Sequence, residues 1–280
     1  MKKSIEKIRC GITGHSGTIG KEIIKSKSKS NILFYKFKGD IRIKKDVRSW
    51  IKNNDFNYLI HLAAVVPIKE VNRNKDKAYD VNVKGTRNIV DAILKTKNKI
   101  KWIFYSSTSH VYSSSKKKIK ENYKTKPISY YGLTKLKGEK ELQILNNYNI
   151  NLCIGRIFST ANNSQRNNYL IPDLKKKIKN LNSKIILDNL NHYRDFISIK
   201  DISKIIIFFL KNKTKGTINI CSGKKTKLMD IAQIIANQYE KKIFFKINNN
   251  ATYLIGNNNL LKNLFKKKIS NDLKKIIFND

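Results

Sequence analysis

Short apolar segments alternate with longer segments of helical period over the first half of the chain, and this alternation limits the fold more than any other feature. The apolar segments are rich in β-branched and aromatic residues, which favour strands. The expected strands are Ile8–Thr13, Ile32–Phe37, Tyr58–Leu62, Lys101–Ser106 and Asn151–Ile157. Helical stretches lie between them, such as Lys77–Leu94, in which Val81, Ile89, Ala92 and Ile93 share a face. This order predicts an α/β fold with a doubly wound, Rossmann-type parallel sheet.

The second half of the chain is less regular. A length of 280 residues suffices for one large α/β domain or for a domain with a smaller lobe. After Arg156 the alternation breaks down, because residues 159–168 form a polar segment typical of a loop and shorter segments follow. We therefore expect a sheet domain over residues 1–155 and a smaller α/β lobe over residues 156–280, with interleaving of the two left open.

A glycine-rich segment, TGHSGTIG at residues 13–20, follows the first expected strand and begins a helix. Its backbone N–H groups, aided by the helix dipole, can hold a dinucleotide pyrophosphate, and glycine lets the backbone approach closely. Such spacing also occurs in ordinary tight turns, but the strand before it and the helix after it favour the dinucleotide. The residues expected at the pyrophosphate are Gly14, Gly17, Thr18, Ile19 and Gly20.

The end of the second expected strand bears on the choice of cofactor. An acidic residue there binds the adenosine ribose and favours NAD. This chain has Lys36 and Lys38 first, and Asp40 only after Gly39. A lysine at this edge can bind the 2′-phosphate of NADP. These residues therefore do not decide between NAD and NADP, and they slightly favour NADP.

The segment SYYGLTK, residues 129–135, places Tyr131 four positions before Lys135. In a helix the two side chains lie on one face, whereas Tyr130 points about 100° away. A free phenol has a pKa of about 10, and a nearby cation stabilises its phenolate. The pair can therefore act in proton transfer near neutral pH, although this spacing alone is more typical of a surface lysine beside a half-buried tyrosine.

The net charge of +39 raises the possibility of nucleic-acid binding. Only eight of the 59 basic residues are Arg, and the lysines are spread through nearly every segment. Arg supplies most base-edge and bidentate phosphate contacts, so we expect no specific nucleic-acid binding, only salt-sensitive adhesion to polyanions. The three cysteines and four histidines show no disulfide or metal-ligand spacing, so no metal is expected. No signal peptide or membrane span is expected either, which favours a cytoplasmic protein.

Several further motifs occur in a fixed order along nearly the whole chain. They are GDIR at 39–42, HLAA at 61–64, VNVKGTRNIVDA at 81–92, SSTSHVY at 106–112, YGLTKLKGE at 131–139, RDFISIKD at 194–201 and INICSGKKTKLMDIA at 218–232. Together with the glycine-rich segment they resemble the extended short-chain dehydrogenase/reductases, the NAD-dependent epimerase/dehydratase family. Within that family the chain is most similar to reductases and 4-epimerases of nucleotide-activated sugars.

The resemblance implies roles for individual residues. Tyr131 matches the catalytic acid or base, Lys135 its partner on the nicotinamide ribose, and Thr108 the hydroxyl that steadies the sugar oxygen. Arg194 resembles the arginine that meets the diphosphate of the substrate, and Asn82 a helix residue behind the active site. The residues that match cofactor contacts, besides the glycine-rich segment, are Asp40 and Ile41 at the adenine and Ala63 and Ala64 along the cofactor.

Departures from the family pattern reduce the number of reactions expected for this chain. Dehydratases place an Asp-Glu pair after the catalytic Thr, whereas this chain has Ser109 and His110, so dehydration is disfavoured. The sugar-contacting Asn that often follows GRIF is replaced by Ser159. The resemblance thus implies an NAD(P)-dependent reductase acting at C4 of a nucleotide sugar, or alternatively a 4-epimerase with tightly held NAD. It also implies a homodimer. A non-catalytic dinucleotide-binding sensor or scaffold is the alternative from another class.

Overall fold

The computed structural model describes residues 7–26, 31–96, 100–161, 169–180, 184–247, 250–270 and 272–278. The chain forms two compact units. The sheet unit comprises residues 1–108, 129–156 and 202–218, and the second unit comprises residues 109–128, 157–201 and 219–280. These units differ from a division near residue 155 at two segments, because residues 109–128 group with the second unit and residues 202–218 with the sheet unit.

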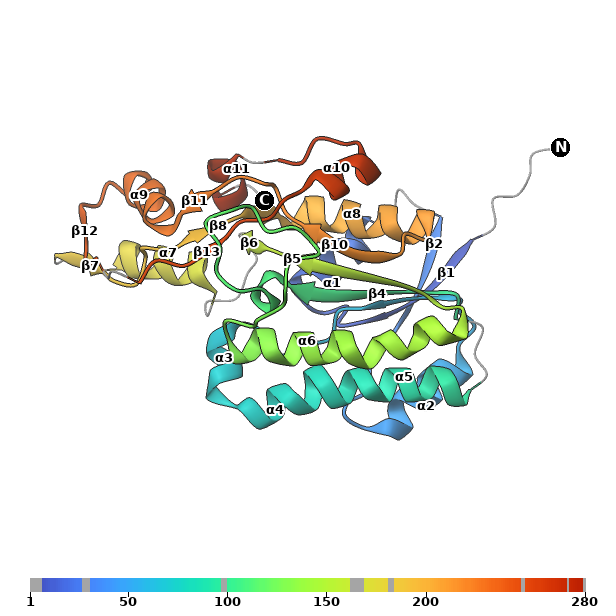
Figure 1. The fold of residues 1–280 in the computed structure, drawn as a ribbon. Helices are drawn as coiled ribbons and strands as arrows, with labels where there is room; N and C mark the ends of the chain where they lie inside the picture. Colours follow the sequence, from blue (N-terminus) through green and yellow to red (C-terminus); the bar gives the residue numbers. More distant parts are fainter. Residues whose placement is uncertain are drawn as a thin grey trace. The chain divides into compact units, whose positions relative to one another are not determined.

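The sheet unit is built on six strands in the order β10-β5-β4-β3-β1-β2 (Figure 1). Their bounds are β1 Ile8–Thr13, β2 Ile32–Lys36, β3 Tyr58–His61, β4 Trp102–Thr108, β5 Asn151–Ile157 and β10 Gly216–Ile220. β1 pairs in parallel with both β2 and β3, and β3 pairs in parallel with β4. The expected Rossmann-type α/β fold is confirmed, and the five expected strands are all present.

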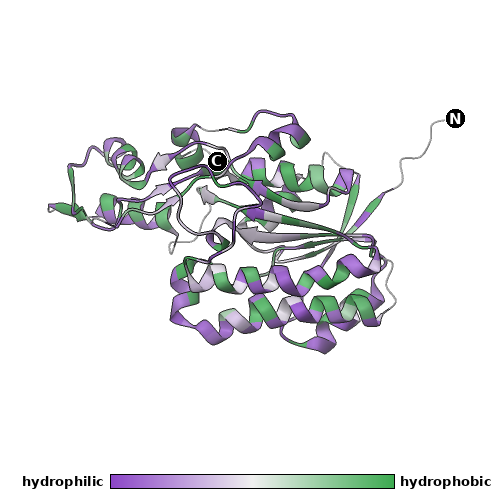
Figure 2. Cartoon of the chain, in the orientation of Figure 1, coloured by the Kyte–Doolittle hydropathy of each residue, from purple (hydrophilic) through white to green (hydrophobic). Residues whose placement is uncertain are grey.

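Burial explains why these strands carry nearly continuous apolar runs. In β4, the four residues Trp102 to Tyr105 are all buried. When helices cover both faces of a parallel sheet, the side chains on both faces are buried, so polar and apolar residues do not alternate along its strands. Helix α8, Ile199–Asn212, lies on one face of the sheet and helices α5, Gly85–Lys95, and α6, Tyr130–Gln143, on the other (Figure 1). Hydrophilic residues recur along α5 and α6, where hydrophobic ones alternate with them (Figure 2).

The remaining helices of the sheet unit are short. They are α1 Thr18–Lys25, α2 Lys44–Asn53, α3 Ile68–Arg73, α4 Lys75–Tyr79 and the 3-10 helix η4 Ile144–Tyr148. The stretch expected as one helix, Lys77–Leu94, is helical throughout, but its second turn, Asp80–Lys84, is a π-helix, η2. A π-turn inserts an extra residue per turn and re-aims the side chains on it. Asn82 in η2 is fully buried.

The second unit has its own apolar core, which includes Ile171, Leu174, Ile231 and Ile235. Its elements are η3 Ser109–Val111, β6 Ser159–Ala161, α7 Leu170–Asn180, β7 Ile185–Leu187, β8 Tyr193–Arg194, β9 Phe196–Ser198, β11 Thr226–Lys227, α9 Leu228–Gln238, β12 Ile243–Phe245, β13 Tyr253–Leu254, α10 Asn259–Phe265 and α11 Leu273–Phe278. Residues 159–161, expected within a loop, form β6 and pair with β9. Residues 162–168 of that expected loop lie outside the described residues.

Candidate active site

Helix α6 presents Tyr131 and Lys135 one turn apart. Its first turn is capped by Ser129, whose Oγ accepts a hydrogen bond from the Gly132 amide at 3.1 Å. Lys135 is buried, with only 1% of its surface exposed, and Tyr131 is half-buried. The neighbouring Tyr130 has the ammonium of Lys75, on α4, 5.6 Å from its ring centroid. The helix therefore separates the two tyrosines as the sequence predicts.

Lys135 lies over an aromatic ring in the core of the sheet unit. Its Nζ is 4.1 Å from the ring centroid of Tyr105, on β4. Burial lowers the pKa of Lys135 to about 7, and the carboxylate of Glu139 partly opposes that shift. Burial also raises the pKa of the Tyr105 phenol well above its usual value, so this ring stays neutral. Lys135 can therefore gain or lose its charge near neutral pH.

Strand β4 ends at Thr108, a buried residue in the sheet unit. The preceding Ser107 donates a hydrogen bond from Oγ to Glu139 on α6, so its hydroxyl is already engaged. Ser109 and His110 follow in the second unit. Burial lowers the pKa of His110 to about 4, with the charge of Arg194 acting in the same direction, so His110 is neutral at pH 7. Neither residue supplies the carboxylate pair that dehydration requires.

The glycine-rich segment has the geometry of a phosphate-binding turn. Gly14 has a φ of +68°, and a Cβ there would lie 2.6 Å from the amide nitrogen of Ala63, which follows β3. At Gly20 a Cβ would collide with the carbonyl oxygen of Gly14. Helix α1 begins after Gly17 without any side-chain cap, so no capping side chain occupies its first N–H groups. These features fit the pyrophosphate of a dinucleotide.

A buried polar chain fixes this turn against the strands beside it. His61 Nδ1 lies 2.7 Å from Thr13 Oγ1, and His61 Nε2 lies 3.0 Å from Thr86 Oγ1. Because Thr86 donates its hydroxyl proton to the Asn82 carbonyl at 2.8 Å, Nε2 carries the imidazole proton and Nδ1 accepts from Thr13. Thr13 Oγ1 in turn accepts from the Ala63 amide at 3.2 Å. Burial lowers the pKa of His61 to about 3, which keeps it neutral.

Asn82 joins the loop after β3 to helix α6. Its Oδ1 accepts from the Val65 amide at 2.7 Å, and its Nδ2 donates to Thr134 Oγ1 at 3.0 Å. Thr134 Oγ1 donates to the carbonyl of Tyr131 at 2.8 Å. Asn82, which lies in the π-turn, is therefore linked through Thr134 to the backbone carbonyl of Tyr131.

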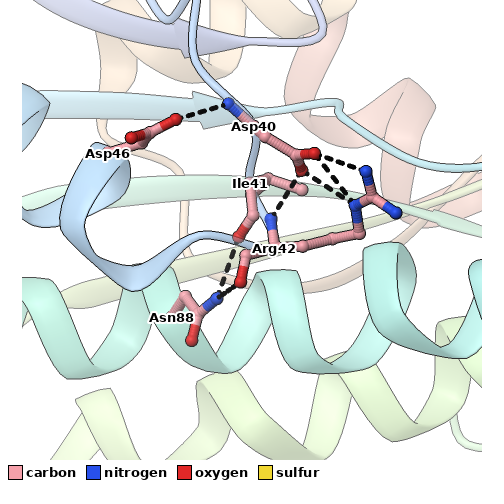
Figure 3. A network of polar contacts seen from close by, with 5 residues as sticks. All are labelled: Asp40, Ile41, Arg42, Asp46 and Asn88. Carbon is pink, nitrogen blue, oxygen red and sulfur yellow. Dashed lines mark hydrogen bonds and ion pairs between the residues drawn. The ribbon is translucent and has the colours of Figure 1, made fainter.

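The segment after β2 is held by a polar network (Figure 3). The carboxylate of Asp40 accepts from Arg42 Nε and Nη2 at 3.0 and 2.5 Å, and this contact lowers the pKa of Asp40. Asn88 on α5 donates to the carbonyl of Ile41 at 2.9 Å. The side chain of Ile41 is buried in the core, where a Cβ at Gly85 would meet it. Asp40 is thus oriented at the surface while Ile41 anchors the segment.

The guanidinium of Arg194, in β8 of the second unit, donates hydrogen bonds to neighbouring residues of that unit. Its Nη1 donates to the carbonyls of Tyr193 and Thr252 at 2.8 and 3.1 Å, and its Nη2 donates to Thr252 Oγ1 at 3.0 Å. Burial lowers its pKa to about 10, so the guanidinium stays charged at pH 7.

Two residues that form a buried ion pair, Glu139 and Arg156, had no role assigned from the sequence. Glu139 belongs to the segment that carries Tyr131 and Lys135, and Arg156 to the GRIF segment, yet only the structure joins them, with Arg156 Nη2 donating to Glu139 Oε2 at 2.7 Å. An acidic residue four positions after Lys135 on an otherwise buried helix face was the available signal. His15 likewise had no role assigned from the sequence. Its buried Nδ1 has no hydrogen-bond partner within the described residues.

The described part of the chain lacks two other kinds of feature. Within it, no three His, Cys, Asp or Glu side chains gather as a metal ion would require. Its helices are all too short or too polar to cross a membrane.

Comparisons with known proteins identify relatives along most of the chain. GDP-6-deoxy-D-talose 4-dehydrogenase of Aggregatibacter actinomycetemcomitans is 28% identical over 80% of this chain and 78% of its own length. The putative UDP-glucose 4-epimerase of Methanocaldococcus jannaschii is 31% identical over 71% of this chain, which spans 66% of that protein. The structure of RMD from Pseudomonas aeruginosa complexed with NADPH has a TM-score of 0.86 at 19% identity and covers 97% of this chain and 95% of its own.

The UDP-glucose 4-epimerase of Thermus thermophilus in complex with NAD has a TM-score of 0.84 at 16% identity, covering 96% of both chains. At these identities the solved structures establish the fold. The sequence profile described as the NAD dependent epimerase/dehydratase family matches residues 10–221, well over half of the chain. The chain therefore belongs to the NAD-dependent epimerase/dehydratase family.

Proposed function

We propose that this protein is an NAD(P)-dependent oxidoreductase that acts on a nucleotide-activated sugar, with net reduction of a keto group at C4 as its reaction. The observation that carries the proposal is the placement of Tyr131 and a buried Lys135 on one face of α6, which packs against the strand ending at Thr108. Relatives that are GDP-sugar dehydrogenases or reductases and UDP-sugar epimerases support the substrate class.

The cofactor is NAD or NADP. Gly14, Gly17, Thr18, Ile19 and Gly20 would hold its pyrophosphate, Asp40 and Ile41 its adenine end, and Ala63 and Ala64 its central part. When bound, the nicotinamide supplies or accepts a hydride. The clash of a Cβ at Gly14 with the Ala63 amide shows how closely two of these segments approach within the sheet unit.

The residues of the chain move and orient the proton. Tyr131 gives its phenolic proton to the sugar oxygen in reduction and takes it back in the reverse direction. Lys135 stabilises the phenolate when charged, and Thr108 holds the same sugar oxygen. Fixing the reacting groups in this geometry can be worth about 7–11 kcal/mol, which is the largest contribution that we assign to the protein.

A 4-epimerase is the second candidate, because the same three residues can serve oxidation followed by reduction of the opposite sugar face. The epimerase relatives favour it. Dehydration is disfavoured, since Ser109 and a neutral His110 follow Thr108. A non-catalytic dinucleotide-binding sensor remains the candidate of another class, and the intact set of Thr108, Tyr131 and Lys135 speaks against it.

The nucleotide released on denaturing the purified protein separates these candidates. Retained NAD would favour the epimerase, because a cofactor that is reduced and reoxidised within one turnover need not leave. A protein that is purified empty and then binds NADPH reversibly would favour the reductase, which exchanges its cofactor in every cycle. Failure to bind either cofactor would overturn the proposed function.

A further inference from the structure

The buried carboxylate of Glu139 lies at the centre of a charged cluster inside the sheet unit. It accepts from Arg156 Nε at 3.1 Å and Nη2 at 2.7 Å, and from the Ser107 hydroxyl. The side chains of the ion pair expose only 2% and 9% of their surface. Glu139 therefore carries its negative charge where water screens it poorly.

The position of Glu139 links this cluster to the proposed proton-transfer residues. Along α6, Tyr131, Lys135 and Glu139 recur every four residues, so successive side chains are neighbours on one face. Ser107 directly precedes Thr108 on β4. From the helix that carries Lys135, one carboxylate thus contacts both the strand that ends at Thr108 and the strand β5 that carries Arg156.

Glu139 has one cation in direct contact, Arg156, and a second, Lys135, one helical turn away on α6. Lys135 has Tyr131 and Glu139 one helical turn away on α6, the Tyr105 ring of β4 against its ammonium, and His61 of β3 within range of its charge. Arg156 of β5 contacts Glu139 itself. Glu139 favours the charged form of Lys135, while its bidentate contact with Arg156 engages both of its oxygens. An ion pair with Arg156 is expected to reduce the effect of the Glu139 charge on Lys135.

We propose that Glu139 is a positioning residue that, shared between Arg156 and Lys135, sets the pH range over which Lys135 stays charged and supports Tyr131. This inference rests on the proposed function and deepens it. A buried ion pair that only joined the helix to the sheet would affect folding, but it would leave the pH range of the reaction unchanged.

Variants of opposite charge effect provide the test. Glu139→Gln removes the anion and is expected to move the alkaline limb of the kcat profile to lower pH by about one unit, because Lys135 then loses its proton earlier. Arg156→Gln frees the carboxylate to act on Lys135 and is expected to move the same limb to higher pH. This second variant also serves if Glu139→Gln fails to fold.

Glu141→Gln is the matched control, since Glu141 lies on the same helix and pairs with Arg87 on α5, but at the surface. Its profile should coincide with that of the unaltered protein. Changes in amplitude without movement of the limb, or movement of both buried variants in one direction, would overturn the inference.

Titration of Lys135 without substrate distinguishes this failure from that of the proposed function. In protein labelled with ¹³C at the lysine Cε, the signal missing from Lys135→Arg identifies the residue. Opposite shifts of its titration midpoint in Glu139→Gln and Arg156→Gln would support the inference even if no sugar is turned over. Equal midpoints in all variants would overturn it, whatever the enzyme turns over.

Discussion

His61 illustrates how burial fixes the state of a single residue. Its imidazole is fully buried between Thr13 and Thr86, and each ring nitrogen has a hydroxyl partner. A charged imidazolium would lose its hydration and would also need a proton acceptor in place of Thr13, which donates to Nδ1. The neutral ring is therefore part of the folded state, and protonation must be coupled to unfolding.

This coupling predicts a loss of stability in acid. The pKa of His61 is about 3 when folded and about 6.5 in the unfolded chain, so its contribution is complete above pH 6.5 and is lost as the pH falls toward 3. The expected slope is about 1.4 kcal/mol per pH unit for one proton. Urea unfolding, followed by fluorescence between pH 7 and pH 5, measures this slope. In His61→Gln the free energy of unfolding should fall less steeply with decreasing pH than in the unaltered protein.

His110→Gln provides the comparison for this prediction, because the pKa of His110 is lowered to about 4 in the second unit. Each variant should remove its own share of the acid destabilisation. An unchanged slope in His61→Gln would contradict the assignment of a neutral, buried His61.

At the scale of elements, α6 packs against β4 without space for even a methyl group at one position. A Cβ at Gly138 would collide with the Tyr105 hydroxyl and would lie 3.1 Å from the carbonyl of Asn82. The fully buried Tyr105 cannot turn away, and the same ring lies against Lys135. The close approach of helix and strand thus fixes the position of the Tyr105 ring against which Lys135, the proposed catalytic lysine, packs.

Gly138→Ala is expected to cost about 1–3 kcal/mol of stability, as overpacking in well-packed cores does. It should also lower kcat, because α6 must move away from β4 and carries Lys135 with it. Denaturant unfolding and steady-state rates measure the two effects. Lys140→Ala, at an exposed position of the same helix, should change neither. A variant at Gly138 as stable as the unaltered protein would contradict this packing.

The sequence was sufficient to predict those parts of the fold and site that depend on local pattern. The bounds of β1 and β5 were predicted correctly, and the helical spacing considered for Tyr131 and Lys135 is present in α6. The π-turn at Asp80–Lys84 was not predicted, because the helical period of the sequence does not distinguish it from an α-helical turn. Asn82 within it accepts a hydrogen bond from the Val65 amide of a different segment, which local pattern does not reveal either. The pairing of Glu139 with Arg156 was missed for the same reason, since it joins a helix to the next strand.

At the scale of the whole molecule, the charge of +39 dominates long-range behaviour. Lysines spread over most segments attract any polyanion without reading its sequence. Two unrelated DNA duplexes should therefore bind equally at low salt, and both should be released as the salt concentration rises, measured by fluorescence anisotropy. A preference for one duplex that persists at high salt would contradict the expectation that the protein binds no specific nucleic-acid sequence.

The same charge would also act on any self-association of the chain. The homodimer implied by the family resemblance remains a prediction, to be measured by sedimentation at several salt concentrations. If the subunits associate, repulsion between strongly cationic chains should make the dimer more stable as salt rises.

The most direct test of the central claim compares Tyr131→Phe with Tyr130→Phe in the turnover of nucleotide sugars. The account predicts that Tyr131→Phe lowers kcat by at least about 100-fold while cofactor affinity stays nearly unchanged, because only proton transfer is lost. Tyr130→Phe, one residue away on another face of α6, should keep the rate of the unaltered enzyme. Equal rates in the two variants, or no turnover of any nucleotide sugar by the unaltered protein, would contradict the account.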